Sequence, residues 1–263
     1  MIEPFLPTPI MHSAVFAVLR RALPTAFAMA LLAGSGPAQA QGRAGVQGVP
    51  AERGPLDIAI ADPDEVVAAE RAFARAVQDK GQWTAFAEYA AEDAVMFVPQ
   101  AVKAHDWLAG RADPPQGVRW QPHEVWMSCD GSLAVTRGGW QRPDGSVGYF
   151  TTVWALAAGQ GEYRWILDQG DALTAPLEAP EAVAETVGDC PFTGSAGMAE
   201  ADLRNLDTEA LNGGATTVGS GWSADGTLAY RYSVQPSGAR EFAVLIVKGG
   251  RVQEVINSEV AAP

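Results

Sequence analysis

The sequence has few residues that bind metals or attack substrates. It contains two cysteines and three histidines in 263 residues. Only His105 and His123 lie beyond the first forty residues, and no third ligand lies near them, so we expect no metal site. No Ser-His-Asp or Cys-His pattern is present, and Gly138-Gly139 is not followed by a helix that could complete a phosphate-binding loop. We therefore expect no cofactor.

Basic residues are also scarce. There are 18 lysines and arginines against 31 aspartates and glutamates, which gives a formal net charge of −13. An acidic surface repels phosphate backbones and anionic lipid headgroups. We therefore expect neither a nucleic acid nor a membrane surface as a partner, and we interpret the charge as a determinant of solubility.

The apolar run 22–33 is too short to span a bilayer as a mature helix. It follows Arg20-Arg21 and precedes Ala38-Gln39-Ala40, which is the order of a secretory signal. The sequence predicts a signal peptide over residues 1–40, cleavage after Ala40 and a periplasmic or secreted protein without a membrane anchor. Both cysteines would enter an oxidising compartment, where a Cys129–Cys190 disulfide and two free thiols are equally open alternatives.

Residues 41–61 are rich in glycine, proline and alanine and predict a flexible leader. A domain over residues 62–172 follows. Asp62 and Pro63 are typical of a helix start, and Gly81 is typical of its end. Apolar residues of this helix share one face with Glu70, which interrupts the apolar stripe. A second helix is expected from Trp83 to Ala90.

Strand signals fill the rest of this domain. Residues 94–98 are all apolar, which predicts a strand covered on both faces. A helical turn is expected over 104–109. The strands that follow are expected to be joined by two Asp-Gly turns and a third, glycine-containing turn. Their predicted ranges are 118–128, 132–141, 147–157 and 162–170.

A change of composition marks residues 173–197 as a linker, and residues 198–263 as a β-rich accessory segment. We expect a weak helix over 198–211 and a sheet of about three strands. Residues 223–229 (SADGTLA) share five of seven positions with residues 128–134 (SCDGSLA), so a partial repeat and two unrelated Asp-Gly hairpins both explain the tail. Residues 242–247 are apolar on both faces, which predicts a central strand.

The order of helix, helix, strand and meander over residues 64–171 resembles the nuclear transport factor 2-like (SnoaL-like) superfamily, in particular a bacterial secreted branch known only as a domain of unknown function. The resemblance depends on four segments: ERAFARAVQDKGQWTAFAEYAAEDAVMFVP, DGSLAVTRGGW, DGSVGYFTTVW and YRWILDQGD. It implies an α+β fold, a cone in which a curved antiparallel sheet packs on helices around an apolar cavity. A fold of this kind implies a cavity and not a reaction.

The candidate catalytic residues are Asp168 and His123. Asp168 lies in a strand between apolar residues, where a carboxylate is either a structural partner or a cavity group with a raised pKa. His123 is either a proton shuttle or an ordinary strand histidine. We expect an aromatic ligand-binding wall with one arginine. Its candidate residues are Tyr89, Phe97, Trp107, Arg111, Trp120, Trp140, Tyr149 and Trp154.

Three functions fit these features. The first is a secreted or periplasmic protein that binds a small apolar or amphipathic molecule in the cavity. The second is an acid–base enzyme of the isomerase, cyclase or dehydratase type acting in the same cavity. The third is a non-catalytic assembly or scaffold domain. A homodimer is open in each case. A cavity that contains a buried carboxylate would favour the enzyme, and a purely apolar one would favour binding alone.

Overall fold

The computed structural model describes residues 61–157, 161–190 and 209–263, all within the compact unit Gly54–Pro263. The expected signal peptide and nearly all of the leader lie outside the described residues. The helices are α1 (Pro63–Lys80), α2 (Gln82–Tyr89) and α3 (Ala104–Leu108). The strands are β1 (Ala90–Phe97), β2 (Ala101–Lys103), β3 (Arg119–Met127), β4 (Leu133–Gln141), β5 (Val147–Leu156), β6 (Tyr163–Leu173), β7 (Ala184–Val187), β8 (Thr217–Trp222), β9 (Leu228–Val234), β10 (Arg240–Lys248) and β11 (Arg251–Val260).

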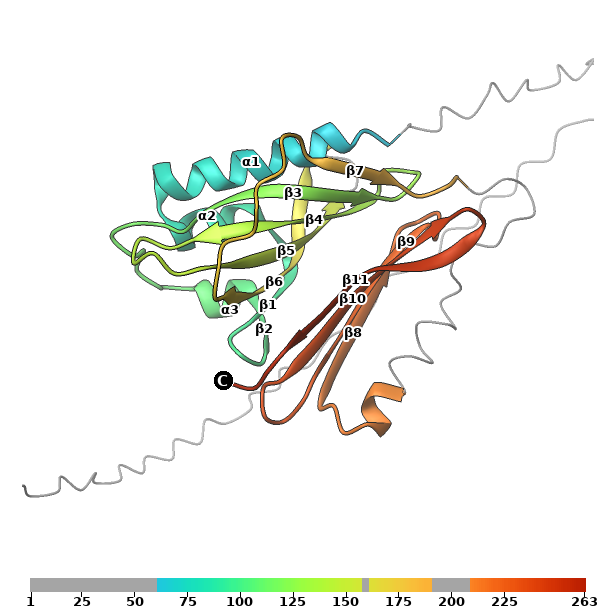
Figure 1. Ribbon diagram of the computed structural model, residues 1–263. Coiled ribbons are helices and arrows are strands. Elements are labelled where there is room, and N and C mark those ends of the chain that lie inside the picture. Colours follow the sequence, from blue (N-terminus) through green and yellow to red (C-terminus); the bar gives the residue numbers. More distant parts are fainter. Residues whose placement is uncertain (1–60, 158–160, 191–208) are drawn as a thin grey trace, which may run out of the picture. The chain divides into compact units, whose positions relative to one another are not determined.

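The fold is of the α+β class, as expected. One sheet has seven strands in the order β2-β1-β6-β5-β4-β3-β7, and a second has four in the order β11-β10-β9-β8 (Figure 1). Strands β3 to β6 form the predicted antiparallel meander. The first sheet is nevertheless mixed, because β1 runs parallel to β6 and β7 runs parallel to β3.

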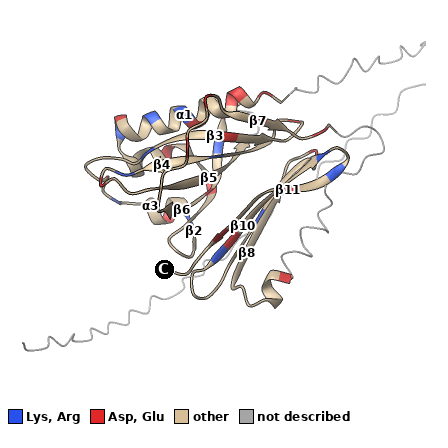
Figure 2. Cartoon of the chain, viewed as in Figure 1, with Lys and Arg blue, Asp and Glu red and all other residues tan. Residues whose placement is uncertain are grey.

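Helix α1 has the predicted ends. The Asp62 side chain accepts a hydrogen bond from the Asp64 amide at 3.1 Å, Pro63 is the first helical residue, and Gly81 follows the last. Acidic residues occupy the first turn and Lys80 the last turn, which complements the helix dipole (Figure 2). The apolar face of α1 packs on the first sheet, so local signals and tertiary packing agree along the whole helix.

Helix α2 is capped by a residue far along the chain. Asp113 Oδ1 accepts from the Trp83 amide at 2.5 Å and the Thr84 amide at 3.1 Å, while Oδ2 accepts from Thr84 Oγ1 at 2.6 Å. These bonds satisfy amides that the first turn of a helix leaves free. Gly81 has a positive φ of 108°, and a Cβ there would collide with the Asp113 carboxylate. The backbone at Trp83 and Thr84 is thereby held in place.

Three expectations need correction. The strand predicted at 94–98 begins earlier, at Ala90. It was expected to be covered on both faces, but only alternate residues such as Ala94 and Met96 are buried, because only the face of β1 towards the helices is covered. The linker predicted over 173–197 contains β7, which pairs through its backbone while its side chains stay largely exposed, so no apolar alternation marks it. The tail has four strands and not three.

The two faces of the first sheet bury different partners. On one face α1 and α2 form a core with Val125, Met127 and Trp154. Residues of the other face join residues of the second sheet in one apolar cluster. The buried members of that cluster are Trp126, Leu133, Val135, Val153, Leu167, Leu228, Phe242, Val244, Ile246 and Ile256. Strand β10, with its apolar residues on both faces, is an inner strand of the second sheet, as predicted. Of the helix expected over 198–211, only residues 209–211 are described, and they are helical.

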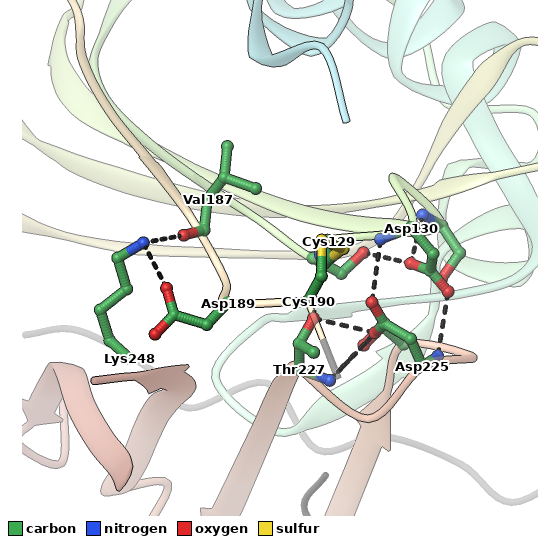
Figure 3. Close-up of a disulfide and its surroundings, with 11 residues drawn as sticks. Cys129, Asp130, Val187, Asp189, Cys190, Asp225, Thr227 and Lys248 are labelled. Atoms are coloured by element: carbon green, nitrogen blue, oxygen red, sulfur yellow. Dashed lines mark hydrogen bonds and ion pairs between the residues drawn. A yellow bond between two sulfur atoms is a disulfide. The ribbon is translucent and has the colours of Figure 1, made fainter. Parts of the chain in front are cut away.

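The two similar Asp-Gly segments fold alike and contact each other (Figure 3). Asp130 Oδ1 accepts from Ser128 Oγ at 2.6 Å and from the Ser132 amide at 2.9 Å. Asp225 Oδ1 accepts in the same way from Ser223 Oγ at 2.6 Å and the Thr227 amide at 3.0 Å.

The remaining carboxylate oxygens join the two loops. Asp225 Oδ2 accepts from the Asp130 amide, and Asp130 Oδ2 accepts from the Asp225 amide, both at 2.9 Å. We call this reciprocal pair the aspartate clasp. Thr227 Oγ1 accepts a hydrogen bond from the Cys129 amide at 2.9 Å, and Ser132 Oγ accepts one from the Ala224 amide at 3.0 Å. These two bonds join equivalent positions of the two loops, so they are symmetric as well.

The likeness continues beyond the loops. A register shift places Ile166 as an extra residue of β6 between the pairs Val153–Leu167 and Trp154–Trp165. A shift of the same kind makes Val255 the extra residue of β11, between the pairs Val244–Ile256 and Leu245–Glu254. The tail sheet therefore reproduces the meander β3 to β6 in strand order, loop structure and bulge position.

A disulfide joins Cys129 and Cys190, with Cα atoms 5.0 Å apart. It closes a loop of 61 residues, which corresponds to about 4 kcal/mol of stabilisation if the loss of unfolded-chain entropy is the only effect. Next to it, Asp189 binds Lys248 Nζ at 2.8 Å and the Gly249 amide at 2.6 Å. The disulfide and this ion pair tie residues 189 and 190 of the linker to the two sheets.

The aspartate clasp predicts a coupled loss of stability. Asp130→Asn and Asp225→Asn should each lower the free energy of unfolding by about 1–2 kcal/mol, because an amide N–H₂ replaces the oxygen that faces the partner's N–H. The double variant should lose less than the sum, because the two bonds depend on one loop contact. Urea unfolding measures all three values.

The matched control is Asp144→Asn, since Asp144 binds Ser146 within its own turn and makes no contact with a second loop. It should leave stability nearly unchanged. Strictly additive losses for the clasp variants would show that the two loops are not coupled.

Candidate functional site

The cavity that contains Asp168 lies between the helices and the edge of the first sheet and has a volume of about 450 Å³. Much of its wall is aromatic or aliphatic, and a few polar residues complete it. The apolar lining residues are Phe73, Trp83, Phe86, Met96, Phe97, Val98, Trp107, Val118, Trp120, Trp140, Phe150 and Ala172, and the others are Gln82, Arg142, Asp168, Gln169, Gly170, Asp171 and Arg240. This volume and lining suit a small organic molecule.

The bulge at Ile166 brings Asp168 to this cavity. Trp165 lies on the helix side of the sheet and Leu167 on the opposite side, so the side chain of Asp168 returns to the helix side. There Asp168 Oδ2 accepts a hydrogen bond from Thr152 Oγ1 at 2.9 Å, across the strand pair. Without the extra residue, strand alternation would place Trp165 and Leu167 on one face.

The carboxyl group of Asp168 holds a proton more tightly than an ordinary aspartate. Burial raises its pKa to about 7, and the negative charge of Glu70 adds to the increase, while the Thr152 hydrogen bond and the charge of Arg240 oppose it. The Asp168 side chain nevertheless keeps some surface towards the cavity. A carboxyl group of this kind can exchange a proton with a bound molecule near neutral pH.

Glu70 of α1 is fully buried on the same side of the sheet and accepts from three side chains. Trp120 Nε1 donates to Oε1 at 2.6 Å, while Thr136 Oγ1 at 2.5 Å and Trp154 Nε1 at 3.0 Å donate to Oε2. Burial raises the pKa of Glu70, and the three hydrogen bonds lower it in part. The three donors come from β3, β4 and β5, so this one carboxylate attaches α1 to three strands.

Trp120 connects Glu70 to the cavity. Its indole N–H is held by Glu70, and its ring lies in the cavity wall. The ring packs edge-to-face against Phe73 at 4.9 Å, Phe86 at 6.1 Å and Phe150 at 6.4 Å between centroids. Aromatic pairs in this geometry stabilise one another and resist rearrangement. The shape of the cavity therefore depends on a buried hydrogen bond.

The candidate residues from the sequence divide into two groups. Asp168, Phe97, Trp107, Trp120 and Trp140 all line the cavity. The other candidates lie elsewhere. These are His123, Tyr89, Arg111, Tyr149 and Trp154.

Each residue of the second group has another environment. Tyr89 stacks on Phe73 with ring centroids 5.1 Å apart and lines a separate surface depression between α1, the end of α2 and the start of β6. The Arg111 guanidinium lies 3.4 Å from the centroid of the Trp107 ring and does not contact Asp168. Tyr149 lies under Arg137, and Trp154 is fully buried against Glu70.

His123 is buried at a register shift of β3, and it lines a different surface depression together with Gly139 and Leu177. Burial lowers the pKa of His123, and the charge of Glu124 opposes this in part. The ring therefore favours its neutral form. The structure does not bring His123 together with Asp168 in the cavity.

Fourteen of the 19 lining residues, Arg240 among them, were not sequence candidates, and neither was Glu70, which binds the wall residue Trp120. Glu70 had a visible signal, because it is the one charged residue on the buried face of α1. Arg240 had none, because it begins a strand of the second sheet and reaches the cavity only through the tertiary structure. Among the described residues, no group of three or more histidine, cysteine or carboxylate side chains could hold a metal ion. No described helix is long and apolar enough to cross a membrane.

Comparison with protein-family models and with curated protein sequences gives no match for this chain.

The raised pKa of Asp168 predicts a pH-dependent stability difference. The folded pKa of about 7 exceeds the ordinary value of an aspartate, which is about 3.9. As pH rises between these values, the unfolded state releases the proton first, so the wild type loses stability. Asp168→Asn does not titrate and can still accept from Thr152.

The variant should therefore gain stability over the wild type progressively, by about 2–4 kcal/mol at pH values above 7. The two proteins should be nearly equal below about pH 4. Thermal or urea unfolding across this range measures the difference. Thr152→Val should move the transition to higher pH, because it removes the donor to the ionised carboxylate. A difference independent of pH would show that Asp168 titrates normally.

Glu70 offers a second test. Glu70→Leu should lower the free energy of unfolding by about 1–3 kcal/mol more than Glu70→Gln, because only leucine leaves the Trp120 N–H without an acceptor. Glutamine is the matched control, since its carbonyl oxygen can still accept from Trp120. Urea unfolding of both variants measures the difference. If the leucine variant were the more stable one, the hydrogen bonds of Glu70 would not contribute to stability.

Proposed function

We propose that the chain binds a small, largely apolar molecule in this cavity and that Asp168 acts on it as a general acid–base group. The observation that supports this most directly is a carboxyl group with a pKa of about 7 in a wall to which eight aromatic side chains contribute. A proton-transfer group is most effective when its pKa lies near the working pH. An ordinary structural aspartate has no need of such a pKa or of access to a cavity.

The reaction class follows from the available groups. The carboxylate of Asp168 can remove a proton from a carbon next to a carbonyl group. The C–H electron pair then moves into the enolate, and the resulting carboxylic acid returns the proton to another atom of the same molecule. This sequence needs no oxidant and no metal, and it describes an isomerase. If the carboxylic acid of Asp168 instead gives the proton to a β-hydroxyl group, the C–O bond breaks, water leaves, and the enolate electrons form the C=C bond, which is the reaction of a dehydratase.

The internal comparison of the two meanders supports a functional role for the polar groups. The apolar positions between the sheets correspond: Leu133 to Leu228 and Leu167 to Ile256. The polar positions differ, because Asp168 pairs with Thr152 whereas Asn257 pairs with Ala243. The meander can therefore form without the carboxylate, which favours a role for Asp168 beyond folding.

The first domain is, in this proposal, a cone of the nuclear transport factor 2-like type. Two helices and a strand precede an antiparallel meander, and the helices cover one face of the sheet, which supports a cone of the nuclear transport factor 2-like type. The disulfide supports export to the periplasm or beyond, because such bonds persist in oxidising compartments. The cavity is not filled by side chains, which argues against a purely structural scaffold.

Hydrogen–deuterium exchange tests the acid–base function even while the natural product is unidentified. The protein is incubated in D₂O with small cyclic and aryl ketones such as 2-tetralone, and loss of the α-proton signals is followed by NMR. The wild type should accelerate exchange for at least one ketone. The rate should fall about tenfold per pH unit below about pH 7, since the base must be ionised.

Asp168→Asn should abolish the acceleration. Asp171→Asn is the matched control, because Asp171 is a second carboxylate of the same cavity wall and should be dispensable. If ketones bind but no exchange depends on Asp168, the cavity serves for binding alone, and the acid–base proposal is wrong.

A further inference from the structure

Arg240 is the one cavity residue that comes from the second sheet. It is the first residue of β10, and only 9% of its surface is exposed. One terminal nitrogen donates to the backbone oxygen of Gly170, and the guanidinium carbon lies 5.2 Å from the centroid of the Phe97 ring. Both of these residues also line the cavity, so the guanidinium is fixed in its wall.

The charge of Arg240 is not matched by a carboxylate. Its Nε has no hydrogen-bond partner, and among the described residues no carboxylate lies within ion-pair distance. Asp168 and Asp171 are close enough only to influence its pKa, which burial lowers. An arginine does not give up its proton in a protein, so a buried guanidinium without an anion is unfavourable. A ligand anion would remove this cost.

The edge of the first sheet gives Arg240 its place in the cavity wall. Strand β1 pairs with β6 only as far as Asp168, so the part of β6 that contains Gln169 and Gly170 is a free edge. Arg240 donates a hydrogen bond to the Gly170 oxygen at this edge.

We infer that Arg240 binds a carboxylate group of the ligand, so that the natural ligand is a small carboxylic acid with an apolar, ring-containing body. The inference depends on the proposed function, because it concerns the same cavity. The fork of N–H groups on a guanidinium matches the two oxygens of a carboxylate, and such charge-assisted bonds are strong. The aromatic wall accommodates the rest of the molecule.

Two probes of the same shape test this. These are 2-naphthoate and its neutral amide, 2-naphthamide, titrated into the disulfide-bonded protein by calorimetry. At about pH 6 Asp168 keeps its proton and does not repel the probe. The wild type should bind the carboxylate about tenfold or more tightly than the amide, as expected for hydrogen bonds to a charged group.

Arg240→Gln should lose this preference and keep its affinity for the amide. Arg240→Lys should retain part of the preference, because a lysine supplies charge without the fork. Arg240→Met keeps an unbranched apolar side chain without the charge and should also lose the preference, which provides a test if Arg240→Gln does not fold. Arg251→Gln is the control for net charge, since Arg251 is the exposed first residue of β11, outside the cavity lining, and should change nothing.

The possible results separate the two proposals. Equal wild-type affinity for both probes, or a preference that survives Arg240→Gln, would overturn the carboxylate inference and leave the cavity function intact. Absence of saturable binding of either probe would contradict both. A carboxylate preference that depends on Arg240, together with ketone exchange that does not depend on Asp168, would support the ligand class and remove the acid–base role.

Discussion

The buried carboxylate of Glu70 is the interaction on which the first domain depends most. A charge in the interior is tolerated only when donors satisfy it, and here Trp120, Thr136 and Trp154 do so from three strands. These bonds fix the position of α1 relative to the sheet, and an apolar residue in the same place would leave this position less specific. Because the Trp120 ring is also cavity wall, the same bonds determine the space in which a ligand can lie.

Most helices and strands of the first domain could be predicted from the sequence. Its helices begin and end with local signals such as Asp62 and Gly81, and the meander strands are separated by Asp-Gly turns, so their ranges follow from nearest neighbours in the chain. Strand β7 could not be predicted in this way. It pairs with β3 in parallel, through backbone groups that carry no sequence pattern, and it lies sixty residues later in the chain than its partner.

The candidate site was predicted only in part, for a similar reason. Asp168 was visible as a carboxylate among apolar residues, but the face on which it lies depends on a bulge at Ile166 that strand alternation alone would not give. His123 was also predicted as a catalytic candidate, but it does not reach the cavity. It lies in a strand of the same sheet, yet its side chain is buried away from the cavity. Arg240 requires the contact between two segments that are about seventy residues apart, which no local pattern contains.

The arrangement of the two sheets gives the tail a further role. The aspartate clasp, the disulfide and the shared apolar cluster all hold the second meander against the first. Covering the apolar face of the first sheet would require only apolar residues such as Phe242 and Ile246 in the second. Arg240 is different, because it extends past that interface to the free edge of β6. The second sheet therefore stabilises the first and also completes the polar wall of its cavity, so a change in their contact would alter the cavity as well as the stability of the protein.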